Sequence, residues 1–464
     1  MREEIRGPGG VRGVGVGAGA GAGAGFGPGS GLGAGFGFGA GLVAAAERID
    51  AATPEGRDRS VDALRAFAIL GVVLGHWLVT ALVADGGTLH TSSPLAHMPW
   101  LAPISWVFQT LAVFFLVGGH VATKSYASAR ARGTTYGRWL ATRLARLFKP
   151  VAAVLGLWTV AAVGLLVTGT DLDTVHALLK LVLSPLWFLL VFAGLTALTP
   201  LVTRVHPLWP LAVVLHVDLV RLGLDGPSWL GWLGWVNVAA GWLVPFTLGA
   251  AWTRGELTRR SGWVLLVSGA ATTAALVAWG GYPASMVGVP GAPISNLDPP
   301  TLAAVVFGTA QCGLALLLRE PLRRAMRRPL LWAGVAVVNL SAMTVFLWHQ
   351  TALMSVTATG LLAGRLPGLH TVPDGVTWVV FRLAWLPVLV VALLVCWAAF
   401  HGYEKGVREK GVCEKGVRER DGRGENGRRE ELGRAEKGRE QGPRVVRAGR
   451  RRPESERDGA VRHV

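Results

Sequence analysis

The chain has 464 residues, of which 51% are hydrophobic and 16% are charged, and its mean hydropathy is +0.42. A soluble protein would carry about a quarter charged residues, so the composition argues against a soluble protein. The net charge of +17 does not indicate nucleic acid as a partner, because the positive residues lie in a tail and in alternate loops, without interleaved aromatics. The three cysteines lack the paired spacing of a disulfide or zinc site, and we expect no metal.

The N-terminal segment is of low complexity. Gly and Ala dominate residues 1–46, in runs such as GVGVGAGAGAGAGFGPG, so we expect residues 1–56 to form a disordered arm. A Gly-x-Gly-x-x-Gly pattern occurs there, but repetition produces it and no predicted strand precedes it. A signal peptide begins with a positively charged segment, and Glu3 and Glu4 therefore argue against a signal peptide here.

Residues 57–403 alternate between long apolar segments and short turns, which predicts a transmembrane domain. We expect helices at 61–84, 101–123, 150–168, 178–199, 207–224, 229–252, 262–282, 301–319, 330–357 and 377–400. The predicted fold class is all-α, a polytopic membrane protein with a bundle of about ten transmembrane helices and disordered termini. The segment 207–224 is the weakest, because it contains Asp218 and Arg221, whose i, i+3 spacing suits a mutual ion pair.

Lys and Arg are distributed unevenly over the predicted loops. Segment 124–149 carries seven of them and segment 319–328 carries five, whereas 85–100 and 283–300 carry none. Cytoplasmic loops are the ones enriched in Lys and Arg. We therefore expect a multi-pass protein of the cell (plasma) membrane with both termini in the cytoplasm and the lipid bilayer as a partner.

The first predicted helix carries two ionisable residues in an apolar stretch. Ser60 is its expected N-cap. Arg65 and His76 lie 11 positions apart. At about 100° of rotation per residue, this spacing places the two side chains within about 20° of the same helix face and about 16 Å apart along the helix axis. Ionisable groups within a membrane indicate function by default. Purely structural roles stay open, with His76 bonded to a neighbouring helix and Arg65 reaching the headgroups.

The segment RSVDALRAFAILGVVLGHW, which contains both residues, resembles the first-helix signature of membrane acyltransferase family 3. Members of this family are integral membrane proteins that move acyl groups onto hydroxyls of sugars, envelope glycans and macrolide-type metabolites. The resemblance covers about residues 58–400. It implies that His76 and Arg65 are catalytic residues.

The stretch YGRWLATRLARLFK, residues 136–149, is basic and amphipathic and predicts a short helix in the cytoplasmic interface. Its Arg143 and Arg146 resemble the family's second motif, an Arg-x-x-Arg just before the third span. Arginine pairs bind phosphate oxygens bidentately, and coenzyme A carries a pyrophosphate and a 3′-phosphate. We interpret Arg143, Arg146 and Arg138 as donor-binding residues, while a purely topological role of these charges remains an alternative.

Three further segments resemble the family. FFLVGGHV, residues 114–121, has His120 where an aromatic residue is usual and Gly118 where Ser is usual, and the Gly118–Gly119 pair permits close helix approach. PLWFLLVF, residues 185–192, contains Trp187, and SAMTVFLWHQTAL, residues 341–353, contains His349 followed by Gln350. The secondary candidates for an acceptor site are therefore His349, His120 and Trp187, with Gln350 beside them. The structural alternative is a hydrogen bond between helices for His349 and Gln350, and an interfacial histidine for His120.

Residues 404–464 are charged and repetitive. The units EKGVR, EKGVC, EKGVR and ERDGR follow one another without an apolar period. We expect a disordered cytoplasmic tail with affinity for anionic lipid.

Together these features predict O-acyl transfer. Acyl-coenzyme A would be the donor substrate, with no permanently bound cofactor. His76, whose unperturbed pKa would be about 6.5, would act as general base on the hydroxyl of a carbohydrate, envelope glycan or glycosylated metabolite. The sequence shows no Ser-centred elbow, so direct transfer is simpler than an acyl-enzyme. The alternative is a multi-span secondary transporter of a small polar solute, which should show two similar halves.

Overall fold

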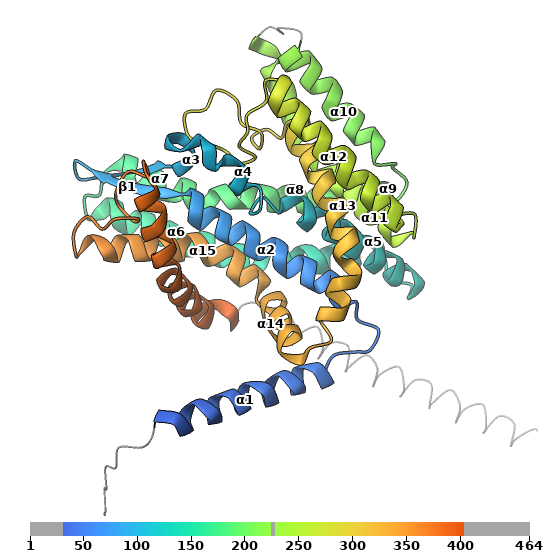
Figure 1. The fold of residues 1–464 in the computed structure, drawn as a ribbon, viewed down its shortest axis with the longest axis horizontal. Coiled ribbons are helices and arrows are strands. Elements are labelled where there is room, and N and C mark those ends of the chain that lie inside the picture. The colour runs from blue at the N-terminus through green and yellow to red at the C-terminus, as the bar shows by residue number, and fades with distance from the viewer. Residues whose placement is uncertain (1–30, 224–227, 403–464) are drawn as a thin grey trace, which may run out of the picture. The chain divides into compact units, whose positions relative to one another are not determined.

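The computed structural model describes residues 31–223 and 228–402, so the predictions for residues 1–30 and for the tail at 404–464 lie outside the described residues. The chain divides into two compact units. The first comprises Met1–Ala63 and Leu318–Val337, and the second comprises Leu64–Leu317 and Val338–Val464. Figure 1 labels the elements of both units.

The first unit contains α1 (Gly31–Ala51), the start of α2 (Arg59–Val79), the end of α13 (Leu302–Ala325) and most of α14 (Pro329–Leu340). Its core is a small apolar cluster of buried residues, namely Ala63, Met326, Trp332 and Ala336. The predicted disorder of residues 1–56 is wrong for α1. Alanines between residues 40 and 51 favour helix, and Ile49 packs against the cluster.

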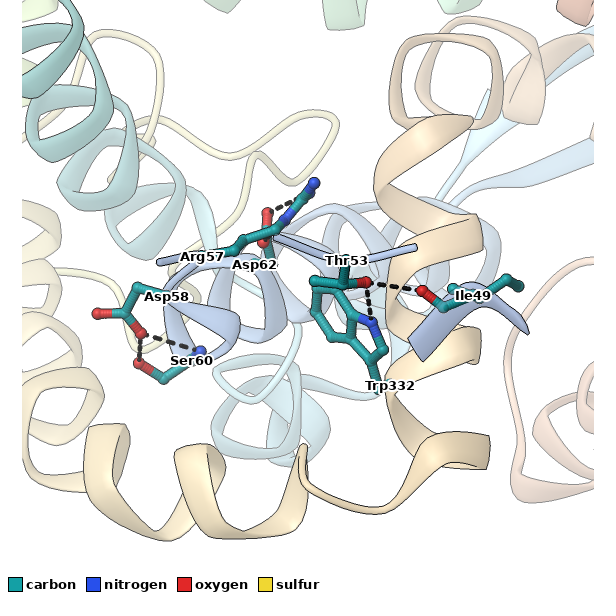
Figure 2. A network of polar contacts seen from close by, with 7 residues as sticks. All are labelled: Ile49, Thr53, Arg57, Asp58, Ser60, Asp62 and Trp332. Atoms are coloured by element: carbon teal, nitrogen blue, oxygen red, sulfur yellow. Dashed lines mark hydrogen bonds and ion pairs between the residues drawn. The ribbon is translucent and has the colours of Figure 1, made fainter. Parts of the chain in front are cut away.

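A network of polar contacts fixes the start of α2 (Figure 2). Asp58 rather than Ser60 caps this helix, because its Oδ1 accepts hydrogen bonds from the Ser60 backbone N–H at 3.1 Å and the Ser60 hydroxyl at 2.5 Å. Arg319 contributes an ion pair to Asp58 at 2.9 Å. Burial alone would raise the pKa of Asp58, but the bonds from Ser60 and Arg319 outweigh burial and hold that pKa below its ordinary value.

Trp332 anchors the segment between α1 and α2. Its indole N–H donates to the Thr53 hydroxyl at 2.8 Å, and that hydroxyl donates to the Ile49 carbonyl at 2.7 Å (Figure 2). The Arg59 guanidinium lies 4.8 Å from the centroid of the Trp332 ring. Side-chain contacts thus hold a segment that lacks regular backbone structure.

In its described residues, the second unit consists mainly of helices and contains one small antiparallel sheet. After α2 the chain forms the hairpin β1 (Ala81–Asp85) and β2 (Thr88–Ser92). The longer helices that follow are α5 (Leu111–Ala131), α6 (Tyr136–Val167), α7 (Leu172–Leu183), α8 (Trp187–Ala197), α10 (Leu208–Asp218), α11 (Val236–Thr253), α12 (Arg259–Trp279), α13, α15 (Ala342–Leu361) and a last helix (Val376–Gly402). The four-residue helices are α3 (Pro94–His97), α4 (Ala102–Ser105) and α9 (Thr199–Val202).

Seven helices of the described residues are long and apolar enough to cross a membrane, and counting α14 with α15 as one interrupted span gives up to eight. These correspond to eight of the ten predicted segments. Segment 101–123 instead forms short helices and the first part of α5, which is not apolar enough to qualify. Segment 207–224 contains α10, whose 11 residues fall short of the about 20 that a span needs. The chain is thus a multi-pass helical membrane protein, but ten spans are not confirmed.

Several helix boundaries differ from the predicted ones, and two of these differences concern helices that carry candidate site residues. The first helix ends at Val79 instead of residue 84, because Gly86 and Gly87, with φ of 56° and 86°, turn the chain back into a hairpin. The stretch at 136–149 is not a separate interfacial helix, since α6 continues without a break from Tyr136 to Val167. Its arginines therefore lie on the same helix as the third predicted span.

Glycines bring α5 and α11 into close contact in the core of the second unit. A Cβ on Gly119 would lie 2.0 Å from the Phe246 carbonyl oxygen, and one on Gly249 would lie 2.1 Å from the Leu116 carbonyl oxygen. Only glycine permits this approach. The close helix approach predicted at Gly118–Gly119 is confirmed.

Asp218 connects α10 to three other segments. Its carboxylate, in a residue only 2% exposed, accepts hydrogen bonds from the Asn237 amide at 2.9 Å, the Tyr282 hydroxyl at 3.1 Å and the Leu302 backbone N–H at 2.6 Å. The predicted partner Arg221 lies 3.9 Å away, at the limit of an ion pair. Asp218 therefore stabilises the junction of α10, α11 and α13 through hydrogen bonds more than through that ion pair.

Candidate active site

His76 faces α15 within the second unit. The centroid of its ring lies 5.1 Å from that of His349, with 49° between the ring planes. Its Nδ1 lies 3.1 Å from Nε2 of Gln350. The neighbouring Trp77 donates its indole N–H to the His349 carbonyl at 3.0 Å, which holds the two helices together at this level. The structure thus joins His76 and His349, two separately predicted candidates, in one site.

His349 is fully buried and has a fixed protonation pattern when it is neutral. Its Nδ1 lies 2.5 Å from the Phe346 carbonyl oxygen. A carbonyl only accepts, so Nδ1 carries the proton and Nε2 the lone pair. Among the residues that the structure describes, nothing forms a hydrogen bond with this buried Nε2. Leaving a buried acceptor unpaired is costly, and a donor group of a bound molecule would remove that cost.

Arg143 is held in place by residues of α5. Its Nε donates to the Ser125 hydroxyl at 3.1 Å and its Nη2 donates to the Val121 carbonyl at 3.4 Å. The guanidinium lies 5.6 Å from the centroid of the Trp139 ring, whose indole N–H also donates to Ser125, at 2.8 Å. The orientation of the guanidinium is therefore set by its neighbours.

Two further positive charges lie near Arg143. Arg146, exposed on α6, and Arg65, half-buried on α2, are both close enough to repel the Arg143 charge. Gathering like charges costs free energy, and a polyanion such as a phosphate would offset that cost. Arg138 is also exposed on α6, five positions before Arg143. The structure thus groups Arg65 with the Arg-x-x-Arg pair.

The other secondary candidates have contacts with α11. His120 stacks on Trp252 at 4.2 Å, and its Nδ1 lies 3.0 Å from the Thr253 hydroxyl. Trp187 begins α8, and its ring centroid lies 6.2 Å from that of Trp242. The acceptor-site roles of His120 and Trp187 stay predictions.

Ser125 is a site residue that the sequence did not reveal. It lies 18 positions before Arg143 on another helix and accepts hydrogen bonds from both Arg143 and Trp139. It belongs to none of the motifs, and no spacing rule relates positions on different helices. Only the packing of α5 against α6 brings it to the arginine.

Apolar helices in sufficient number to cross a membrane several times, with a pair of histidines between them of which His349 is fully buried, define the class of protein as a multi-pass membrane protein with a polar interior site. A family model described as an acyltransferase domain, Acyl_transf_3, matches residues 58–401. This match covers most of the chain, and the protein belongs to that acyltransferase family. No curated protein and no solved structure matches the chain.

Proposed function

We propose that the protein transfers an acyl group from acyl-coenzyme A to a hydroxyl of a carbohydrate, an envelope glycan or a glycosylated metabolite. The observation that carries this proposal is the contact of His76 with His349 and Gln350 in a chain of the acyltransferase family. A hydroxyl is a weak nucleophile without a base, and imidazole is the side chain most often used for that purpose.

In the proposed step, His76 removes the proton of the acceptor hydroxyl as the oxygen attacks the thioester carbonyl. A carbon–oxygen bond forms, the carbon–sulfur bond breaks, and the electron pair leaves with the sulfur. The proton on the imidazole then passes to the thiolate, which yields free coenzyme A and the neutral base. Atoms and charge balance without another reactant.

The arginines suit the phosphates of the donor. Arg143 and Arg146, with Arg65 and Arg138 nearby, present guanidinium groups that bind phosphate oxygens bidentately. The concentration of Lys and Arg in segments 124–149 and 319–328 supports a cytoplasmic position for this face and for both termini, in the cell membrane. The donor would then enter from the cytoplasm.

Turnover of acyl-coenzyme A distinguishes the proposed enzyme from a transporter. Purified protein in detergent, where no gradient exists, should release coenzyme A from radiolabelled acetyl-coenzyme A and pass the label to an acceptor extracted from the native membrane. A transporter would need a gradient and would leave the thioester intact. Intact thioester in the presence of that extract would refute the proposed function.

Replacing Arg146 with Ala should raise the KM for acyl-coenzyme A by about 10- to 100-fold, because hydrogen bonds to charged groups contribute about 1.5–3 kcal/mol each. Arg146→Lys should restore affinity only in part, since lysine lacks the planar fork. Arg143→Ala should have a similar effect, with some loss of packing against Trp139. Arg204→Ala, another exposed arginine, serves as the control and should leave KM unchanged. An unchanged KM in the Arg143 and Arg146 variants would leave these charges with a topological role.

A further inference from the structure

We propose that Gln350 is a positioning residue that determines which nitrogen of His76 carries the proton. This inference rests on the proposed function, since it concerns the base of that reaction. A neutral imidazole has one N–H and one lone pair. For Nε2 of His76 to accept the hydroxyl proton, Nδ1 must be protonated, and its N–H needs an acceptor.

Gln350 is placed to supply that acceptor. Its amide nitrogen Nε2 is the atom placed 3.1 Å from Nδ1 of His76, while its Oε1 is buried without a hydrogen-bond partner among the described residues, and the residue is only 2% exposed. Exchanging these two atoms by a turn of the amide puts the acceptor oxygen against Nδ1. Within residues 31–223 and 228–402, this amide is the hydrogen-bond partner found for the His76 ring.

The orientation of the amide decides the chemistry of His76. Turning the amide by 180° exchanges its oxygen and nitrogen while the heavy atoms stay in nearly the same places. With Oε1 towards His76, the amide accepts from Nδ1–H and the lone pair remains on Nε2. With the NH₂ group towards His76, the lone pair is used at Nδ1 and Nε2 cannot act as a base. Catalysis by His76 through Nε2 thus requires the first orientation.

The α15 helix is held by hydrogen bonds on both sides of Gln350. The residue before it, His349, accepts the Trp77 indole N–H at its carbonyl, 3.0 Å away. The residue after it, Thr351, accepts the Trp158 indole N–H at its hydroxyl, also at 3.0 Å. Two tryptophans, one from α2 and one from α6, therefore fix the position of Gln350 along the helix relative to His76. A positioning residue needs such support from its neighbours.

The side chain of Gln350 is uncharged, and this affects the pH at which His76 becomes protonated. A carboxylate at this place would accept from Nδ1–H as well, but it would stabilise the imidazolium that forms when His76 takes up a proton. The histidine would then become protonated at a higher pH and lose its function as a base there. Gln350→Glu should therefore move the acid limb of the pH profile without removing activity.

The test compares Gln350→Glu and Gln350→Met with wild type, as coenzyme A release from radiolabelled acetyl-coenzyme A in native membranes over a range of pH. We expect Gln350→Met to lower kcat by about 10- to 100-fold, as loss of a supporting hydrogen bond typically does. We expect Gln350→Glu to retain turnover, with the acid limb of kcat/KM about one pH unit or more higher. Gln109→Met is the matched control, since Gln109 is also buried and its amide donates to the Met286 carbonyl. Its pH profile should match wild type.

A wild-type kcat in Gln350→Met, or an unmoved acid limb in an active Gln350→Glu, would overturn the proposal. Nitrogen-15 NMR of histidine-labelled wild-type protein, assigned by comparison with His76→Gln, tests it without any variant at position 350. A His76 signal with the proton on Nδ1 supports the proposal, and one with the proton on Nε2 contradicts it. This measurement does not depend on turnover, so it separates failure of the Gln350 assignment from failure of the proposed acyl transfer.

Discussion

Replacing His76 with Gln should lower kcat by about 10²–10⁴-fold, the usual effect of removing a general base. Glutamine keeps polarity and approximate size but cannot take up a proton. Protein abundance and the KM for acyl-coenzyme A should stay close to wild type, because the arginines that suit the donor lie at other positions. Coenzyme A release and membrane protein yield, measured side by side, check this expectation.

His370→Gln is the matched control for His76. His370 is fully buried in the same unit, but both of its ring nitrogens have backbone partners, the Leu366 N–H at 3.0 Å and the Thr357 carbonyl at 2.8 Å. Its replacement should lower folding yield more than turnover per molecule. If His76→Gln instead turns over at the wild-type rate with the acid limb of kcat/KM intact, His76 is not the base, and His349 becomes the next candidate.

Replacing Asp218 with Ala should lower the free energy of unfolding by about 3–5 kcal/mol, the usual cost of breaking a buried charged network. The change would leave the buried donors on Asn237 and Leu302 and the half-buried hydroxyl of Tyr282 without their acceptor, and Arg221 without its counter-charge. Asp218→Asn should cost less, since it keeps one acceptor oxygen. Thermal unfolding in detergent, followed by tryptophan fluorescence, measures the difference.

Asp171 provides the comparison for Asp218. It is exposed and caps α7 by accepting the backbone N–H groups of Asp173 and Thr174, each at 2.9 Å. Asp171→Ala should cost only about 1 kcal/mol, as for other N-caps. Equal losses in the two alanine variants would show that the buried junction at Asp218 contributes no more than an exposed cap.

Hydropathy predicted most of the helices because it measures what lipid requires of a span. It failed where protein rather than lipid covers a helix. The α5 helix is largely buried by its neighbours, and its glycines and polar residues reflect contact with other helices. The hairpin after Val79 also escaped prediction, because Ala81–Asp85 is as apolar as the helix before it and only Gly86 and Gly87 mark the turn.

The site was predictable at single positions but not in its pairings. Helix geometry and the family motif indicated His76, and the Arg-x-x-Arg spacing indicated Arg143 and Arg146. The amide of Gln350 is 274 positions from His76 along the chain, and no local spacing relates the two residues. The N-cap of α2 shows the same limit on a smaller scale. Asp58 and Ser60 are both residue types that suit a helix N-cap, and only the backbone turn, in which the Ser60 N–H donates to Asp58, favours Asp58.

The glycine contact between α5 and α11 has a consequence for biosynthesis. The α5 helix is not apolar enough to be a candidate span by itself, and the surface that covers it belongs to a helix that the ribosome makes much later. A nascent chain that ends before Val236 therefore exposes the face of α5 around Gly119 without its partner. Packing of this part of the protein therefore has to wait until α11 has been made, and we expect a chain that ends before Val236 to be less stable in the membrane than the full chain.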